Sequence, residues 1–330
     1  MGAVRLLPYY IRRIWDDALY HGYGKRRRFF EGWYYKLVDS TGKNRFAVIP
    51  GIALGDGERT AHAFIQILDG TGVRAHYERY DINDFQHDPL RFDIRIGRNR
   101  FTRDHVKCAV TADRFSFAAD VSLQHTTPWP VTLFAPGIMG PYAFAPFMEC
   151  YHGVLSLDHA LEGTVSIDDR YVDMNDGRGY CEKDWGRSFP SAWVWMQTNH
   201  FPEPETSLTF SLAKIPWLNG RFTGCIAGLL LRGKLYRFAS YTGARLKEIA
   251  VSSAEVRCTV ADGRCALHIV AQRGAGAALA APADGVMTGR IAESMSSRIM
   301  VTFTDRGKEI YSGEGMHGGL EVGGDITQLT

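Results

Sequence analysis

Apolar and polar residues alternate with a period of two along most of the chain, the pattern of β-strands with one buried face. The alternation begins near Phe29, and turn sequences such as Asp69-Gly70-Thr71-Gly72 separate its short runs. Because few helical segments intervene, the pattern predicts antiparallel meanders rather than βαβ units. Predicted strands span residues 29–39, 45–52, 60–68, 91–96, 101–103, 106–111 and 115–123, then 149–157, 163–167, 179–183, 192–200, 207–215, 223–232, 234–241, 254–260, 265–272, 287–291, 297–304 and 309–314.

A different period marks the start of the chain, where apolar residues recur at helical spacing within residues 5–21. The sequence therefore predicts a short N-terminal helix there. The basic run Lys25-Arg26-Arg27-Arg28 follows it. A helix packed on the core with a solvated basic turn explains both features, and peripheral contact with anionic lipid through residues 5–28 is the alternative.

The strand pattern is interrupted at residues 124–148, which hold five prolines and no helical signal. We expect this segment to be a crossover between domains or a lid. The predicted domains are residues 1–145, with the leading helix and the crossover, and residues 146–330. Two meanders of this size predict two β-barrels or strongly bent sheets, because a barrel removes exposed strand edges. The low-complexity stretch Gly274–Ala281 is expected to be a loop.

Composition narrows the class of protein. The chain has 330 residues, which suggests two domains. Its 38 Lys and Arg against 36 Asp and Glu give a net charge of +2, so nucleic acid is not an expected partner. The 35 glycines exceed the usual share and, together with 12% aromatic residues, fit short strands joined by tight turns.

No cofactor or metal site is predicted from motifs. The six cysteines lack C-x-x-C spacing, and neither a phosphate-binding glycine loop nor a G-x-S-x-G elbow is present. His152, His200, Glu149 and Asp184 could bind a metal, but no spacing singles them out. Residues 1–7 lack the apolar stretch of a secretory signal, so we expect a cytoplasmic protein with free thiols, with membrane association left open.

Four segments place acids, amides and aromatic residues on one strand face each, because residues two apart share a face. Large aromatic residues are unusual on a solvated face, so these segments are candidates for lining a cavity. The candidate acid–base residues are Glu31, Glu149, Glu182, Asp184 and His200. The candidate substrate-binding residues are Trp33, Tyr35, Tyr151, His152, Trp185, Trp193, Trp195, Gln197 and Asn199.

This combination suits protonation of an apolar substrate. A buried carboxyl can hold its proton near neutral pH, and aromatic faces can stabilise a developing carbocation. Each residue also has a structural explanation. Glu31 could pair with Lys36 or Arg28, and the tryptophans could be core residues.

Five motifs resemble, in order, those of the tocopherol cyclase family. They are Phe30-Glu31-Gly32-Trp33-Tyr34-Tyr35-Lys36, Phe147–Gly153, Glu182–Gly186 with Phe189-Pro190, Trp195–Phe201 and Gly319-Leu320-Glu321-Val322. They extend over nearly the whole chain. One departure is Asp184, where the plant cyclases carry Asn.

The resemblance implies two lipocalin-like β-barrels, with the Glu182–His200 block in the second, and no redox cofactor. It also implies closure of a chromanol ring by adding a phenol oxygen to a prenyl double bond; the related carotenoid hydratases protonate similar alkenes. Our first hypothesis is therefore cyclisation or hydration of a lipophilic alkene, with Glu149 or Asp184 as proton donor and Asn199 and His200 orienting the phenol. A lipocalin-like carrier without catalysis and a carboxylate-dependent hydrolase are the alternatives. The oligomeric state is not predicted.

Overall fold

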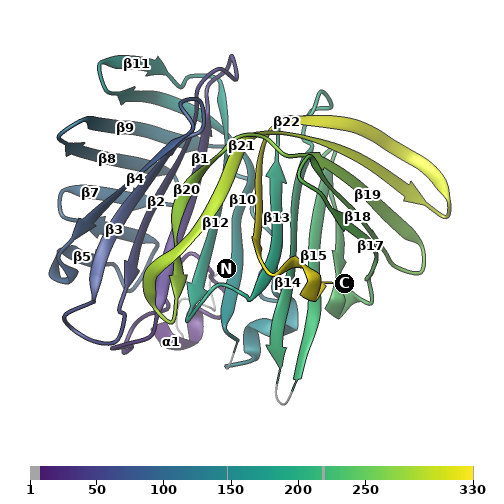
Figure 1. Cartoon of the computed structure of the whole chain (residues 1–330), viewed down its shortest axis with the longest axis horizontal. Coiled ribbons are helices and arrows are strands. Elements are labelled where there is room, and N and C mark those ends of the chain that lie inside the picture. The colour runs from purple at the N-terminus through teal and green to yellow at the C-terminus, as the bar shows by residue number, and fades with distance from the viewer. Residues whose placement is uncertain (1–7, 147, 218–219, 330) are drawn as a thin grey trace. The chain divides into compact units, whose positions relative to one another are not determined.

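The computed structural model describes residues 8–146, 148–217 and 220–329, and it consists almost entirely of antiparallel strands (Figure 1). The predicted all-β class is confirmed. The strands form two sheets, and the chain divides into two compact units, each of which contains most of one sheet.

The first sheet carries the order β4-β3-β2-β1-β12-β10-β9-β8-β7-β6-β5, with β11 paired to β10. All of its pairs with a described register are antiparallel. Its strands are β1 (Phe30–Val38), β2 (Arg45–Ala53), β3 (His62–Asp69), β4 (Arg74–Tyr80), β5 (Phe85–His87), β6 (Asp93–Ile96), β7 (Asn99–Thr102), β8 (His105–Ala112), β9 (Phe115–Gln124), β10 (Cys150–Ile167), β11 (Arg170–Asp173) and β12 (Gly177–Gly186).

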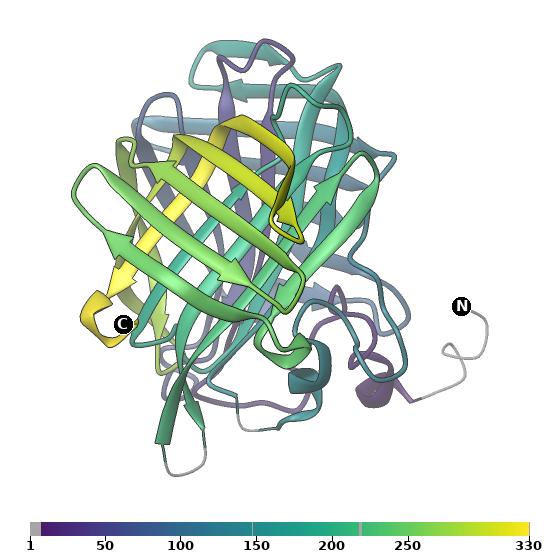
Figure 2. The ribbon, with the colours of Figure 1, turned by 90° about the vertical axis from the view of Figure 1, so that its right-hand side faces the viewer.

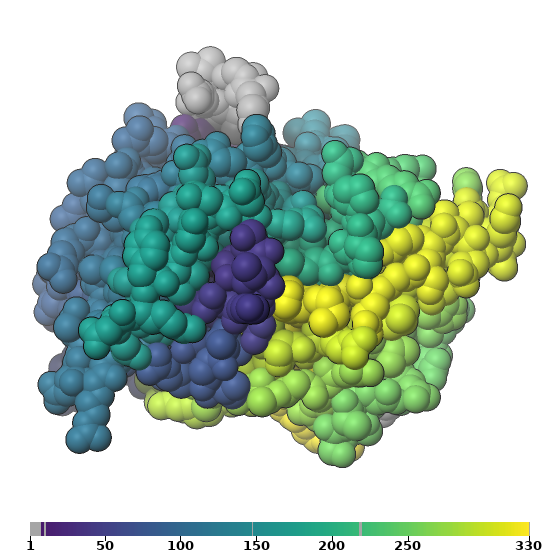
Figure 3. Space-filling view, turned by 90° about the horizontal axis from the view of Figure 1, so that it is seen from above, coloured from purple at the N-terminus to yellow at the C-terminus, as the bar shows by residue number. Residues whose placement is uncertain are grey.

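The second sheet carries the order β16-β15-β14-β13-β22-β21-β19-β18-β17, with β20 paired to β21. Figure 2 looks onto its green and yellow strands. In Figure 3 the outer part of β22 is a yellow band on the surface. The strands are β13 (Ala192–Thr198), β14 (Ser207–Trp217), β15 (Gly220–Leu231), β16 (Lys234–Ala239), β17 (Arg245–Val251), β18 (Glu255–Ala261), β19 (Cys265–Gln272), β20 (Gly276–Ala283), β21 (Val286–Asp305) and β22 (Lys308–Gly324).

Each unit has its own core, built from the inward residues of alternating strands. The first contains Trp33, Tyr35 and Phe101, and the second contains Phe210 and Phe303. All six cysteines lie in the described part of the chain, and none of them is bonded to another.

Helical structure is limited to single turns. The helix expected over residues 5–21 is only α1 (Tyr9–Arg12), and residues 1–7 lie outside the described range. After α1 the Asp16 side chain accepts the N–H of Ala18, a local turn that competes with helix continuation. The 3₁₀ turns are η2 (Ile82–Asp84), η3 (Gly140–Phe144), η4 (Ser240–Thr242) and η5 (Ile326–Leu329). No helix in the described ranges is long and apolar enough to cross a membrane.

The division between units differs from the expected boundary at 145/146. Strands β10 and β12 pair within the first sheet, and the chain passes to the second unit between Phe189 and Pro190. The units also exchange short segments: residues 279–290 belong to the first and residues 70–74 to the second.

The stretch Gly274–Ala281 was predicted to be a loop, and most of it is β20. Its small residues hide the strand signal, because alanine and glycine have low strand propensity and strand formation here depends on pairing with β21. In the first unit, the Gly55 N–H donates to the Gly285 carbonyl, and the Gly285 N–H donates to the Arg187 carbonyl. These bonds hold the hairpin between β20 and β21.

Candidate active site

Strands β1, β12 and β10 lie side by side, and their register places most of the first unit's candidate residues together. Gly32 and His152 both lie opposite Asp184, on either side of β12. Because side chains alternate, the residues divide into two groups on opposite faces of the sheet. Trp33, Tyr35 and Trp185 face the core, whereas Glu182 and Asp184 lie on the other face with His152.

The core-facing group is organised by an ion pair between Glu31 and Lys183. The Lys183 ammonium lies 2.5 Å from the Glu31 carboxylate, and neither side chain has exposed surface. Glu31 also accepts the backbone N–H groups of His21 and Gly22 at 2.9 and 3.0 Å. The sequence suggested Lys36 or Arg28 as partners for Glu31, but Arg28 pairs with Asp284.

Lys183 has further partners in the segment that precedes β1. Its ammonium donates to the carbonyls of Asp17 at 2.7 Å and Leu19 at 2.5 Å, and it lies 2.7 Å from Nδ1 of His21. It also lies over the rings of Trp33 and Trp185. Four acceptors and two aromatic rings around one ammonium indicate a structural centre that anchors residues 17–22 to the sheet.

The protonation states of Glu31 and His21 agree with a structural role for this centre. Burial alone would raise the pKa of Glu31, but the Lys183 charge and His21 hold it below its usual value. Burial and the Lys183 charge lower the pKa of His21 to about 4, so its ring is neutral near pH 7. Glu31 is therefore an ionised acceptor with occupied oxygens, which is unfavourable for a proton donor.

On the opposite face, His152 lies between two carboxylates. Its Nδ1 is 2.9 Å from Asp184 Oδ1, and its Nε2 is 3.6 Å from Glu182 Oε2. The Tyr180 hydroxyl donates to Glu182 at 2.5 Å. Burial would lower the pKa of His152, but Glu182 and Asp184 outweigh it and raise that pKa to about 9. At neutral pH the His152 ring is therefore protonated, and its positive charge lies between the carboxylates of Glu182 and Asp184.

We call His152, Glu182 and Asp184 the His152 cluster. Their side chains differ in how much of their surface is exposed to solvent. The Asp184 side chain is 28% exposed, compared with 12% for His152 and 6% for Glu182. Asp184 is therefore the member that a ligand can reach most easily.

The His152 cluster could also supply metal ligands, because its three donor atoms lie within 4.8 Å of one another. However, the imidazole directs one nitrogen towards each carboxylate. That arrangement suits a bridging proton better than an ion bound at one common point.

Other candidates of the first unit have structural contacts. The Tyr35 hydroxyl donates to the Thr102 carbonyl in the core, and the side chain has no exposed surface. Tyr151 stacks on Trp185 with ring centroids 5.4 Å apart. The Glu149 carbonyl, just before β10, accepts the N–H of Arg187. Within this unit, the carboxylates of the His152 cluster and the aromatic residues Trp33, Tyr35 and Trp185 therefore do not share a face.

The second unit contains the remaining candidates, so the Glu182–His200 block does not belong to one barrel as expected. Trp193, Trp195 and Gln197 lie on β13, with Asn199 and His200 just beyond it. The side chains of Trp193, Trp195 and Gln197 lie on the face of β13 opposite the core residues Val194 and Met196, as the alternation predicted.

Strand β22 supports the two tryptophans. A Cβ on Gly323 would lie 2.3 Å from the Trp193 ring, and one on Gly319 would lie 2.7 Å from the Trp195 ring. Each indole therefore lies over a glycine that leaves room for it. Between them, Glu321 accepts a hydrogen bond from Trp193 Nε1 at 2.9 Å. These contacts explain the spacing of Gly319, Glu321 and Gly323 along β22.

Sequence reasoning missed several residues of these clusters. His21 and Asp17 carried no local signal because their partners are distant in the sequence, and Lys183 appeared only within the Glu182–Gly186 motif. Glu321 appeared only within a family motif, and Tyr180 was not considered.

Two antiparallel sheets, each with its own core, define the class as a lipocalin-like double-barrel protein, and the comparisons with known proteins agree. Residues 122–324, more than half of the chain, match the family model described as tocopherol cyclase-like. The chain belongs to the tocopherol cyclase-like family.

The rice (Oryza sativa subsp. japonica) protein named probable tocopherol cyclase, chloroplastic, is 23% identical over 282 residues, or 70% of this chain. This match covers 60% of the rice protein's length. Among solved structures, CghA with Sch210972 has a TM-score of 0.57 at 10% identity, covering 90% of this chain and 89% of CghA. Kievitone hydratase from Nectria haematococca has a TM-score of 0.50 at 13% identity, covering 89% of each chain. At these identities the structural likeness concerns the fold.

Proposed function

We propose that this protein is a cofactor-independent enzyme that adds an oxygen nucleophile across the double bond of a lipophilic alkene. In the cyclisation, a prenylated phenol or quinol would supply its own hydroxyl; in a hydration, water would supply the oxygen. Family membership and the hydratase among the structural neighbours support this reaction class. The observation that carries it is the imidazolium of His152 between two carboxylates.

The chemistry balances without a redox partner. A proton adds to one alkene carbon, the oxygen attacks the resulting carbocation, and the hydroxyl proton leaves to a base. The substrate is therefore isomerised on cyclisation and gains one water on hydration. One acid–base cluster can supply the first proton and receive the last.

Asp184 is the proposed donor within the His152 cluster. An imidazolium with a pKa of about 9 is a weak acid for an alkene. A carboxylic acid is intrinsically a stronger acid than an imidazolium, and Asp184 is the more accessible of the two carboxyls in the cluster. An apolar substrate over the accessible Asp184 would displace water and favour uptake of a proton by the cluster. His152 would then exchange protons with Asp184 over their 2.9 Å contact.

The test uses the full chain, a prenylated quinol such as dimethylphytylbenzoquinol, and D2O as solvent. The proposal expects a chromanol with one deuterium on the carbon that was protonated. Asp184→Asn and His152→Gln should each lower turnover by about 100-fold or more, as expected for loss of general acid catalysis. Glu162 is an exposed acid on β10, the strand that carries His152. Glu162→Gln is therefore the matched control and should keep full activity.

Tight binding of the quinol without turnover, unchanged by Asp184→Asn, would contradict the enzyme and support a carrier. Turnover that both cluster variants retain would instead show that the proton comes from elsewhere, including the candidates Glu149 and His200.

A further inference from the structure

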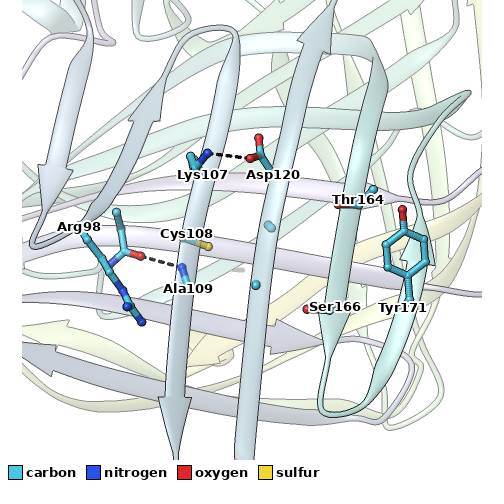
Figure 4. A pocket seen from close by; sticks show the side chains of 11 residues that line it. Arg98, Lys107, Cys108, Ala109, Asp120, Thr164, Ser166 and Tyr171 are labelled. Carbon is cyan, nitrogen blue, oxygen red and sulfur yellow. Dashed lines mark hydrogen bonds and ion pairs between the residues drawn. The ribbon is translucent and has the colours of Figure 1, made fainter.

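A hollow crosses strands β8 to β11 on the outer side of the first sheet (Figure 4). Its volume is about 410 Å³, within the range of small-molecule sites. From β10 it includes Thr164 and Ser166, near the C-terminal end of that strand. It shares no residue with the His152 cluster.

The hollow exists because its floor is a row of small side chains. Ala109 lies opposite Ala118, Ala118 lies opposite Ser166, and Ser166 lies opposite Tyr171. These four residues therefore form one line across four strands. With neighbouring strands about 4.8 Å apart, three steps give a trough of roughly 14 Å. We call this row and its rim the β8–β11 trough.

The two ends of the trough differ chemically. Arg98 lies at one end, and among the described residues its guanidinium has no ion-pair partner (Figure 4). Tyr171 lies at the other end, and 68% of this residue is exposed.

The charges of the two ionisable residues on β8 and β9 that line the trough, Lys107 and Asp120, compensate each other. Lys107 lies 2.9 Å from Asp120, so its charge is compensated. Next to Arg98, the buried Asn99 accepts the N–H of Ala109 at 2.7 Å, and its amide donates to the Ile96 carbonyl at 2.9 Å. These bonds hold the turn that carries Arg98 against β8, so the backbone of Arg98 has a defined place relative to the floor.

We propose that the β8–β11 trough binds an elongated amphiphile with one carboxylate. The carboxylate would pair with Arg98, and the apolar chain would lie over Ala109 and Ala118 towards the ring of Tyr171. A guanidinium suits a carboxylate because it can donate two parallel hydrogen bonds. The methyl floor and the exposed tyrosine ring offer apolar surface to a chain, while a second charge would meet no partner along the floor.

Calorimetry with dodecanoate and the full chain tests this proposal. We expect one saturable site, about tenfold weaker in Arg98→Gln because a charge-assisted hydrogen bond is lost. Dodecanol, which has the same chain without the charge, should bind weaker by a similar factor. Ala118→Leu should abolish binding by filling the floor. Arg114→Gln, an exposed arginine outside the trough, is the matched control and should leave affinity unchanged.

Amide chemical shifts locate the ligand independently of affinity. Dodecanoate should shift the resonances of Ala109, Ala118 and Ser166 at the same concentrations that saturate the calorimetric signal. Binding that is equal in wild type, Arg98→Gln and Ala118→Leu would place the amphiphile elsewhere and overturn the proposal. Equal affinity for dodecyltrimethylammonium, which carries the opposite charge, would overturn it as well.

Discussion

The ammonium of Lys183 on β12 lies 2.5 Å from the carboxylate of Glu31 on β1, with both side chains completely buried. This pair joins residues far apart in the sequence and also fixes the segment before β1 through the Asp17 and Leu19 carbonyls. A buried charge without its partner is costly, so loss of either partner should destabilise the first unit.

Lys183→Met should lower the free energy of unfolding by about 3–5 kcal/mol, because it leaves the Glu31 carboxylate buried without a counter-ion. The double variant Lys183→Met with Glu31→Gln removes both charges and should be less destabilised than Lys183→Met alone. Urea denaturation followed by circular dichroism measures both. A double variant that is less stable than either single variant would argue against this electrostatic account.

Asp17→Asn should stabilise the protein above pH 7. Burial raises the pKa of Asp17 to about 7, so folding opposes ionisation of this carboxyl. Below about pH 4 the acid is neutral in both states and has no such cost. Between pH 4 and 7 the cost grows, and above pH 7 it is complete. Because Asp17 is partly accessible, we expect a gain of order 1–2 kcal/mol at pH 8.

Thermal denaturation at pH 4 and pH 8 measures this difference between Asp17→Asn and wild type. The same shift at both pH values would mean that the amide acts through packing. Asp16→Asn serves as the comparison, because Asp16 instead pairs with Arg103 at 2.8 Å. Its substitution should destabilise the protein slightly.

His152 should titrate near pH 9 in the folded protein. Its pKa is raised above the unfolded value, so its contribution to stability is complete below about pH 6.5 and is lost as the pH rises towards 9. NMR of the imidazole ring measures the midpoint directly. Asp184→Asn removes one of the two charges that hold the proton and should shift the midpoint downward by one unit or more. A midpoint near 6.5 in the wild type would remove the basis of the proposed proton source.

Gly323→Ala should displace the indole of Trp193, because the added Cβ would lie 2.3 Å from the ring. The hydrogen bond from Trp193 to Glu321 would break, at a cost of about 1.5–3 kcal/mol. Near-ultraviolet circular dichroism and tryptophan fluorescence report the change in ring environment. Gly263→Ala adds the same methyl where no atom lies within 4 Å and should leave both spectra unchanged.

The all-β class could be predicted because the period of two is local: each strand shows which residues are buried. The face assignments of Glu182 with Asp184 and of Trp193 with Trp195 follow from the same rule. The alternation within one strand does not show which distant strand it pairs with. His152 meets Asp184 only through the register of β10 on β12, which includes irregularities after Val154 and cannot be read from either strand alone.

The errors in the prediction have the same origin. The helix over residues 5–21 was inferred from apolar spacing, but most of that segment serves tertiary contacts: the Ala18 carbonyl accepts Trp33 Nε1, and the Leu19 carbonyl accepts Lys183. The strand β20 was missed because its small residues depend on β21 for pairing. In both segments tertiary contacts override local propensity.

The exchange of segments has a consequence for biosynthesis. Residues 279–290 complete the first unit, although most of the second unit precedes them in the chain. During translation the N-terminal unit therefore cannot reach its final set of contacts until the ribosome has released residue 290. The usual order, in which an N-terminal domain finishes folding before the next one emerges, is not available here. All strands of the first sheet have been synthesised by then, so the first unit must wait with a complete set of strands but without the contacts of residues 279–290.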